Sequence, residues 1–97
     1  MGGFAARKAL TVVEHVEIVI AIELLCACQA IEFFRPLRTS EPLEAVHRII
    51  RSRVPAWDVD RHMSPAIDAC VELIRSGAIA QAAQPFLDAS EPLASRL

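Results

Sequence analysis

The sequence predicts an all-α protein, with one long N-terminal helix followed by two shorter helices. Residues 4–34 contain neither proline nor glycine, and two later segments carry start and stop signals typical of helices. No segment alternates apolar and polar residues in the manner of a β-strand. We therefore assign residues 1–84 to one helical unit and expect residues 85–97 to form a loosely ordered tail.

The composition predicts a protein that associates with itself or with other chains. The chain has 97 residues, of which 54% are hydrophobic, and its net charge is -2. A domain of this size buries only about 60–65% of the surface that its unfolded chain exposes, so part of the apolar surface would remain exposed to solvent. This surplus predicts a homo-oligomer or burial in a larger assembly. The mixed signs of charge argue against a nucleic-acid partner.

The long helix over residues 4–34 is predicted to be apolar around most of its circumference. At 100° per residue its polar side chains gather on one stripe of Arg7, Thr11, Glu14, Gln29 and Glu32, with Lys8 and His15 beside it. Such a helix is buried on most of its sides, and at ~45 Å it is too long for a small globule to wrap. It is expected to be a strut in a multi-helix bundle. Glu17, Glu23 and Gln29 interrupt the apolar run, which argues against a membrane span.

The second predicted helix follows a corner that Pro36 opens. Ser40 or Glu41 is its expected cap, and Pro42 suits its first turn, to which Glu44 adds an acid. Pro55 is expected to stop it. Its apolar face is predicted to consist of Leu43, Val46, Ile49 and Ile50.

The third predicted helix begins at Ser64-Pro65, a serine cap followed by proline at the first helical position. Gly77 is its expected C-terminal stop. The alanine-rich residues 78–84 are interpreted as an extra helical turn.

Glu23 is the unusual residue of the long helix, because it projects from the apolar side. An isolated buried carboxylate is costly, so Glu23 is expected to pair with an arginine or to accept backbone hydrogen bonds. We favour a structural ion pair within or between subunits; the alternative is a general base. No catalytic, cofactor-binding or metal-binding residue is assigned.

The cysteines and histidines do not predict a metal site. Cys26 and Cys28 point ~200° apart on a helix, and together with Cys70 they are interpreted as reduced, buried packing residues of a cytoplasmic protein. His15 is expected in solvent and His47 on a surface-facing turn, and no pair among the three histidines has ligand spacing.

The loop over residues 58–65 collects side chains that are common in active sites. They are Asp58, Asp60, Arg61, His62 and Ser64. We interpret Asp60 and Arg61 as residues that stabilise the loop and Ser64 as a helix cap. The alternative is a direct catalytic role.

Three stretches together resemble the C-terminal region of histidine ammonia-lyases, within the aromatic amino acid lyase family. They are "AIELLCACQAIEF" followed by the basic corner "RPLRTS", then "LEAVHRIIRSRVP", and then "DRHMSPAIDACVELIRSG". The resemblance covers about residues 1–84. It implies a helical bundle from a longer homotetrameric enzyme that eliminates ammonia from an amino acid.

The resemblance also implies a methylidene-imidazolone electrophile, formed from an Ala-Ser-Gly triplet, and catalytic tyrosines. This chain has neither that triplet nor any tyrosine, and Met1-Gly2-Gly3 follows where the family's glutamine-glutamate motif ends. No catalytic residue is therefore carried over, and no cofactor is expected in this chain. We expect a scaffold segment that is inactive alone and that partners with itself or with the N-terminal part of a lyase. The alternative is a stand-alone helical oligomerisation module without enzymatic activity.

Overall fold

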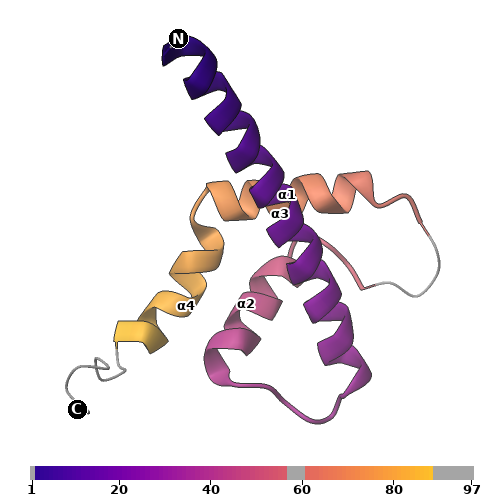
Figure 1. The fold of residues 1–97 in the computed structure, drawn as a ribbon. Helices are drawn as coiled ribbons and strands as arrows, with labels where there is room; N and C mark the ends of the chain where they lie inside the picture. Colours follow the sequence, from indigo (N-terminus) through magenta and orange to yellow (C-terminus); the bar gives the residue numbers. More distant parts are fainter. Residues whose placement is uncertain (1, 57–60, 89–97) are drawn as a thin grey trace.

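The computed structural model describes residues 2–56 and 61–88 of the chain. It contains four α-helices: α1 (Gly2–Phe33), α2 (Glu41–Arg51), α3 (Ser64–Arg75) and α4 (Ala78–Asp88) (Figure 1). No β-strand occurs in either described range. The predicted all-α class and the three predicted helices are confirmed.

The fourth helix is longer than the extra turn predicted over residues 78–84. It continues through Pro85 and ends at Asp88, so the first residues of the predicted tail are helical. Proline lacks an N–H and disfavours a helix interior, which is why the sequence suggested an earlier end. Tertiary packing outweighs that preference here, because α4 packs along α2. The rest of the predicted tail, residues 89–97, lies outside the described residues.

The helices are grouped around the C-terminal half of α1. After the corner at residues 34–40 the chain turns back as α2, α3 crosses α1 near its middle, and α4 lies along α2 (Figure 1). The N-terminal half of α1 projects beyond the other three helices. The Cα radius of gyration is accordingly 16.4 Å, whereas a compact domain of 100 residues has about 13 Å.

The buried core is small and one-sided. It consists of Ala21, Leu25 and Cys28 of α1, Ile50 and Val54 of the α2 region, and Ala66, Cys70, Val71 and Leu73 of α3. The three α1 residues are spaced i, i+4 and i+7, so they lie on one stripe of the helix. Of the predicted apolar face of α2, Ile50 is fully buried while Leu43 is 54% exposed.

The rest of α1 is left uncovered by its own chain. Large apolar side chains that remain exposed along it are Phe4, Leu10, Val12, Val13, Val16, Ile18, Val19, Ile20 and Ile22. This agrees with the prediction of a strut that its own chain does not wrap. None of the helices in the described ranges combines the length and apolar character that a membrane crossing requires.

The predicted helix ends are largely found, with two shifts. Ser40 is the N-cap of α2 and Pro42 lies in its first turn, but α2 ends at Arg51, before Pro55 is reached. The N-cap of α3 is Met63 and not Ser64. Gly77 has a φ of +82°, a left-handed conformation that glycine adopts without steric cost, and it separates α3 from α4.

Candidate functional site

Glu44 is the anchor of a polar network at the corner between α1 and α2. Its side chain is almost fully buried, and Arg35 donates two hydrogen bonds to it, from Nη1 to Oε1 at 2.7 Å and from Nη2 to Oε2 at 2.8 Å. The backbone N–H of Thr39 donates to Oε1 at 3.0 Å. Bidentate pairing with a guanidinium is among the strongest arrangements for a carboxylate. The hydrogen bonds from Arg35, together with that from Thr39, lower the pKa of Glu44 more than burial raises it, and they hold that pKa at about 2.

Glu32, the last residue but one of α1, forms a second network. Arg51 Nε donates to Glu32 Oε1 at 2.5 Å, and His47 Nε2 lies 3.1 Å from the same oxygen. Partial burial favours a raised pKa, but these hydrogen bonds and the charge of Arg51 leave the pKa of Glu32 lowered. The ionised carboxylate can only accept, so His47 Nε2 is the donor.

The second network corrects the prediction for His47, which was expected on a surface-facing turn. Its side chain is only 13% exposed. His47 and Arg51 are spaced i, i+4 on α2, so both reach the same carboxylate on α1. One feature of the sequence pointed to this network, namely the position of Glu32 on the polar stripe of α1. The sequence did not indicate which residues of other segments contact that stripe.

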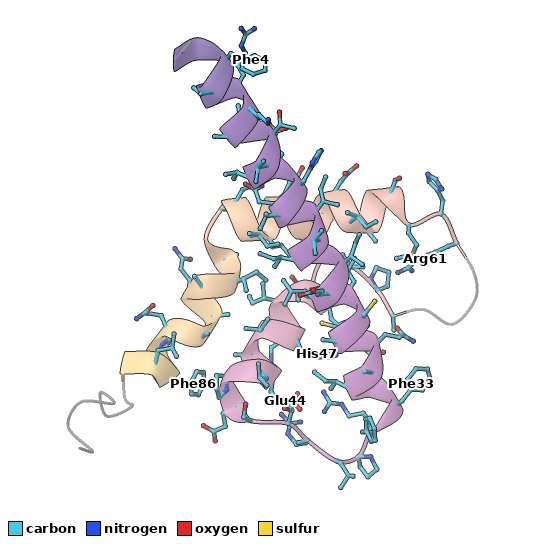
Figure 2. The ribbon with its side chains drawn as sticks, viewed as in Figure 1. Phe4, Phe33, Glu44, His47, Arg61 and Phe86 are labelled. Carbon is cyan, nitrogen blue, oxygen red and sulfur yellow. The ribbon has the colours of Figure 1, made fainter. Side chains whose placement is uncertain are left out.

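An open groove runs between the corner and α2. Its volume is about 460 Å³, and its lining residues are Arg35, Arg38, Glu44, His47, Arg48, Arg51 and Ser52. Glu44 and His47 lie on the side of α2 near the end of α1 (Figure 2). Arg35 and Arg51 are held by the two carboxylates, whereas Arg38 has one contact to Glu44 at 3.7 Å and is 66% exposed. The groove therefore carries more positive than negative charge.

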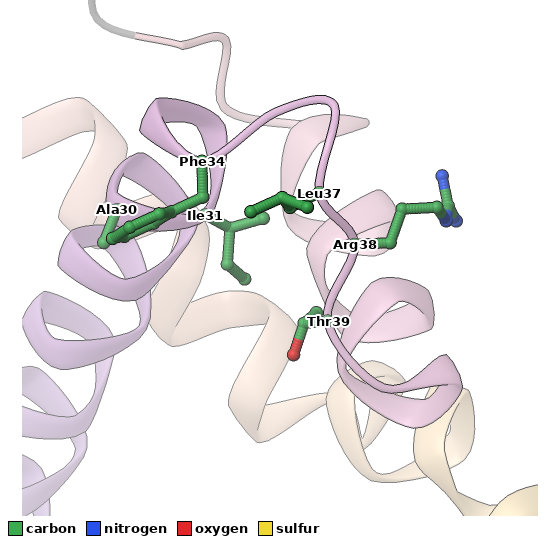
Figure 3. A pocket seen from close by; sticks show the side chains of 6 residues that line it. All are labelled: Ala30, Ile31, Phe34, Leu37, Arg38 and Thr39. Carbon is green, nitrogen blue, oxygen red and sulfur yellow. The ribbon is translucent and has the colours of Figure 1, made fainter.

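A second, apolar pocket of about 330 Å³ lies at the same corner and shares Arg38 with the groove. It is lined by Ala30, Ile31, Phe34, Leu37, Arg38 and Thr39 (Figure 3). Phe34 and Leu37 are both largely exposed, so this pocket is a shallow apolar surface in the isolated chain.

Glu23 does not form the pairing that was expected within this chain. Its side chain is exposed, and in the part of the chain that the structure describes it has neither a hydrogen bond nor an ion pair. Solvent reaches it because only the stripe through Ala21 and Leu25 faces the core. An ion pair to another subunit stays a prediction.

The cysteine prediction is right for two residues and wrong for one. Cys28 and Cys70 are buried free thiols, and burial raises the pKa of both. Cys26 is exposed, because it points away from Cys28 around the helix. Within residues 2–56 and 61–88, no three His, Cys, Asp or Glu side chains are placed to hold a metal ion.

The loop at residues 58–65 is only partly described. Asp58 and Asp60 lie outside the described residues, so the predicted pair of Asp60 with Arg61 is not visible. Arg61 Nη2 donates to the backbone oxygen of Pro55 at 2.5 Å, and His62 is exposed. Ser64 is the first residue of α3 and not its cap.

The residues present do not fit the electrophile that the resemblance implies. That group is built from a chain's own Ala-Ser-Gly triplet, which this sequence lacks, and the Glu32 and Glu44 carboxylates are both engaged by arginines.

The comparisons with known proteins agree with the fold. The family described as aromatic amino acid lyase matches residues 1–52. The histidine ammonia-lyase of Caenorhabditis elegans is 54% identical over 93 residues, which are 96% of this chain and 14% of that protein. The human histidine ammonia-lyase is 53% identical over 88 residues, or 91% of this chain and 13% of that protein.

A solved structure extends this similarity to three dimensions. The crystal structure of histidine ammonia-lyase from Trypanosoma cruzi has a TM-score of 0.86 and 53% identity, over 89% of this chain and 17% of that one. This chain thus spans about one seventh of the length of the curated relatives that it matches. The similarity holds in sequence and in helical arrangement at once, and the chain belongs to the aromatic amino acid lyase family.

Proposed function

We propose that this chain is a helical scaffold segment of an enzyme that eliminates ammonia from an amino acid, with histidine as the first substrate to test. The identity of more than half of the aligned residues to histidine ammonia-lyases supports the reaction class. The bare apolar surface of α1 supports the scaffold role, and it is the observation on which the proposal rests. Another part of the enzyme, or another copy of the chain, covers this surface.

In this proposal the chain contributes structure and not the reacting groups. It contains no Ala-Ser-Gly triplet and no tyrosine. Its carboxylates Glu32 and Glu44 pair with arginines: Glu32 joins α1 to α2 through Arg51, and Glu44 joins α2 to the corner through Arg35. The role of these groups is to fix the corner at the end of α1, so that the exposed side of the helix is presented in one orientation.

The first experiment tests whether the chain is inactive alone. The purified chain is incubated with histidine, and formation of urocanate is followed by its ultraviolet absorbance. We expect no turnover, while a complete histidine ammonia-lyase assayed in parallel gives a steady rate. Turnover by the chain alone would contradict the proposal, because the electrophile would then not be required.

The second experiment tests whether the chain completes an enzyme. A histidine ammonia-lyase truncated before the matching segment is co-expressed with this chain, and activity is expected only when both are present. The double variant Val16→Lys/Val19→Lys places charges on the bare surface and should abolish this complementation. The variant Gln81→Lys, at an exposed position of α4, is the control and should complement normally.

The third experiment measures association directly by light scattering after size-exclusion chromatography. The chain is expected to associate through Val12, Val16, Val19 and Ile20, all of which are 41% exposed or more. Leu24 packs against the core and is expected to matter less. Association without complementation would favour the alternative function, a stand-alone oligomerisation module. A monomer would contradict the stand-alone module, and a monomer that also fails to complement the truncated lyase would contradict the scaffold function as well.

A further inference from the structure

The groove between the corner and α2 has an excess of positive charge. Four guanidinium groups line it, from Arg35, Arg38, Arg48 and Arg51. They face the carboxylate of Glu44 inside the groove and that of Glu32 behind it. The two carboxylates therefore leave about two positive charges uncompensated, and such a concave patch attracts anions.

The four arginines fall into two pairs with different environments. Arg35 and Arg51 use their donors within the protein: Arg35 binds Glu44 and the oxygen of Leu37, and Arg51 binds Glu32 and the oxygen of Val54. Their side chains are 32% and 15% exposed, so these two guanidiniums are fixed in place. They form a rigid floor whose charge is largely balanced by Glu44 and Glu32, so the uncompensated charge of the groove belongs to the other two arginines.

The other two arginines, Arg38 and Arg48, have N–H donors that bind no described residue. Arg48 is exposed and has no hydrogen bond or ion pair to any described residue. Arg38 reaches only Glu44, at 3.7 Å, which is longer than a hydrogen bond. Arg48 lies on α2 and Arg38 on the corner at residues 34–40, so they stand on two different walls of one groove. Guanidinium donors from two segments that line one groove suit an anion with several oxygens.

We propose that this groove binds a small molecule carrying at least two negative charges, such as a phosphate monoester or a tricarboxylate. A volume of about 460 Å³ exceeds what a single phosphate group fills and falls within the range of small-molecule sites. Arg38 and Arg48 bind the anion, and Arg35 and Arg51, paired with Glu44 and Glu32, hold the floor of the groove in place. The proposed anion site lies at the C-terminal end of α1, and anion binding there does not depend on lyase activity.

The experiment is an isothermal titration of the full 97-residue chain with inorganic phosphate and with citrate, at constant ionic strength set by chloride. We expect saturable binding of both anions. The double variant Arg38→Ala/Arg48→Ala should weaken binding at least tenfold. Arg53→Ala, which removes an exposed arginine outside the groove, should leave it within about twofold. Absence of saturable binding, or equal binding by the first variant and the wild type, would overturn the proposal.

Two further measurements keep the result interpretable. The variant Arg38→Lys/Arg48→Lys retains both charges but loses the guanidinium fork, so its affinity should fall between wild type and the alanine variant. The same titration is repeated on a complete lyase that carries this segment. Binding there with the same dependence on Arg38 and Arg48 supports a free anion as the ligand. Its loss overturns the proposal, because an acidic side chain of the longer protein would then fill the groove.

Discussion

The two halves of α1 belong to one continuous helix but have opposite surroundings. Residues 18–33 supply Ala21, Leu25 and Cys28 to the core, whereas no residue from 2 to 16 is even partly buried. Both halves are rich in apolar side chains, and both are helical. The N-terminal half of α1 is therefore helical although no other segment of the chain covers it. Burial of apolar side chains normally supplies most of a helix's stability. The bare half is expected to draw that stability from a partner.

The largest expected effect separates the two halves directly. Ile50→Ala removes a side chain that is fully buried beside the covered half, and it should lower the free energy of unfolding by about 2–5 kcal/mol. Val12→Ala, at a position that is 55% exposed, should change it by less than about 0.5 kcal/mol in the monomer. Urea unfolding followed by circular dichroism measures both. An effect of Val12→Ala that grows with protein concentration would show that a second copy covers the bare half.

A smaller effect is expected at the turn that positions α3 and α4. Gly77→Ala forces alanine into a φ of +82° and should cost about 1 kcal/mol, since nothing lies within 4 Å of the added Cβ and only the backbone is strained. Gly3→Ala is the matched control in the bare half. It adds a better helix former in open space and should be neutral or slightly stabilising in the same thermal or urea unfolding measurement.

The polar corner predicts a dependence of stability on pH. The pKa of Glu44 is about 2 in the folded chain against an ordinary 4.5. Folding thus favours the ionised carboxylate, and its contribution is present above pH 4.5 and lost as pH falls toward 2. Glu44→Gln should remove this acid-dependent loss from the urea midpoint.

Arg35→Lys serves as the graded control for that experiment. It keeps the positive charge but loses the two parallel hydrogen bonds, so the pKa of Glu44 should lie closer to 4.5 in the folded variant. The acid-dependent loss of stability should still begin near pH 4.5, but it should be smaller and end at a higher pH than in the wild type. A wild-type midpoint that is constant from neutral pH to pH 2 would contradict the role of Glu44.

The smallest effect is expected from an ion pair on the surface of the covered region. Arg53 Nη2 lies 2.7 Å from Glu72 Oε2, but the two side chains are 44% and 67% exposed. Water and salt screen such a pair, so Arg53→Ala should cost at most about 0.5 kcal/mol in urea unfolding. A cost comparable to that of Ile50→Ala would mean that surface ion pairs, and not the apolar core, hold the helices on α1.

Local signals in the sequence located most of the helices. The absence of proline and glycine over residues 4–34 predicted α1 to within two residues of each end. Ser40 with Pro42 located the start of α2, and Gly77 located the end of α3. These signals work because caps, proline and glycine act on the backbone within a few residues. The helix through Pro85 was missed, because its packing against α2 is not a local property.

The candidate site was less accessible from the sequence. Glu44 was interpreted only as an acid in the first turn of a helix, and His47 as a surface residue. Both depend on which side of α2 faces the end of α1, and pairing across 9 to 19 positions has no local signature. Glu23 shows the converse, since its apolar neighbours suggested burial and the chain leaves it exposed.

The sequence by itself determined the helical class, the long apolar rod and the lack of the family's electrophile triplet and tyrosines, because each follows from residue types and short spacings. Only the tertiary structure decided which stripe of that rod is buried, that Glu32 and Glu44 each meet arginines, and that a basic groove lies beside them. The physical reason is that burial and charge pairing depend on contacts between segments far apart in the chain, whereas helix propensity and capping act within a few residues.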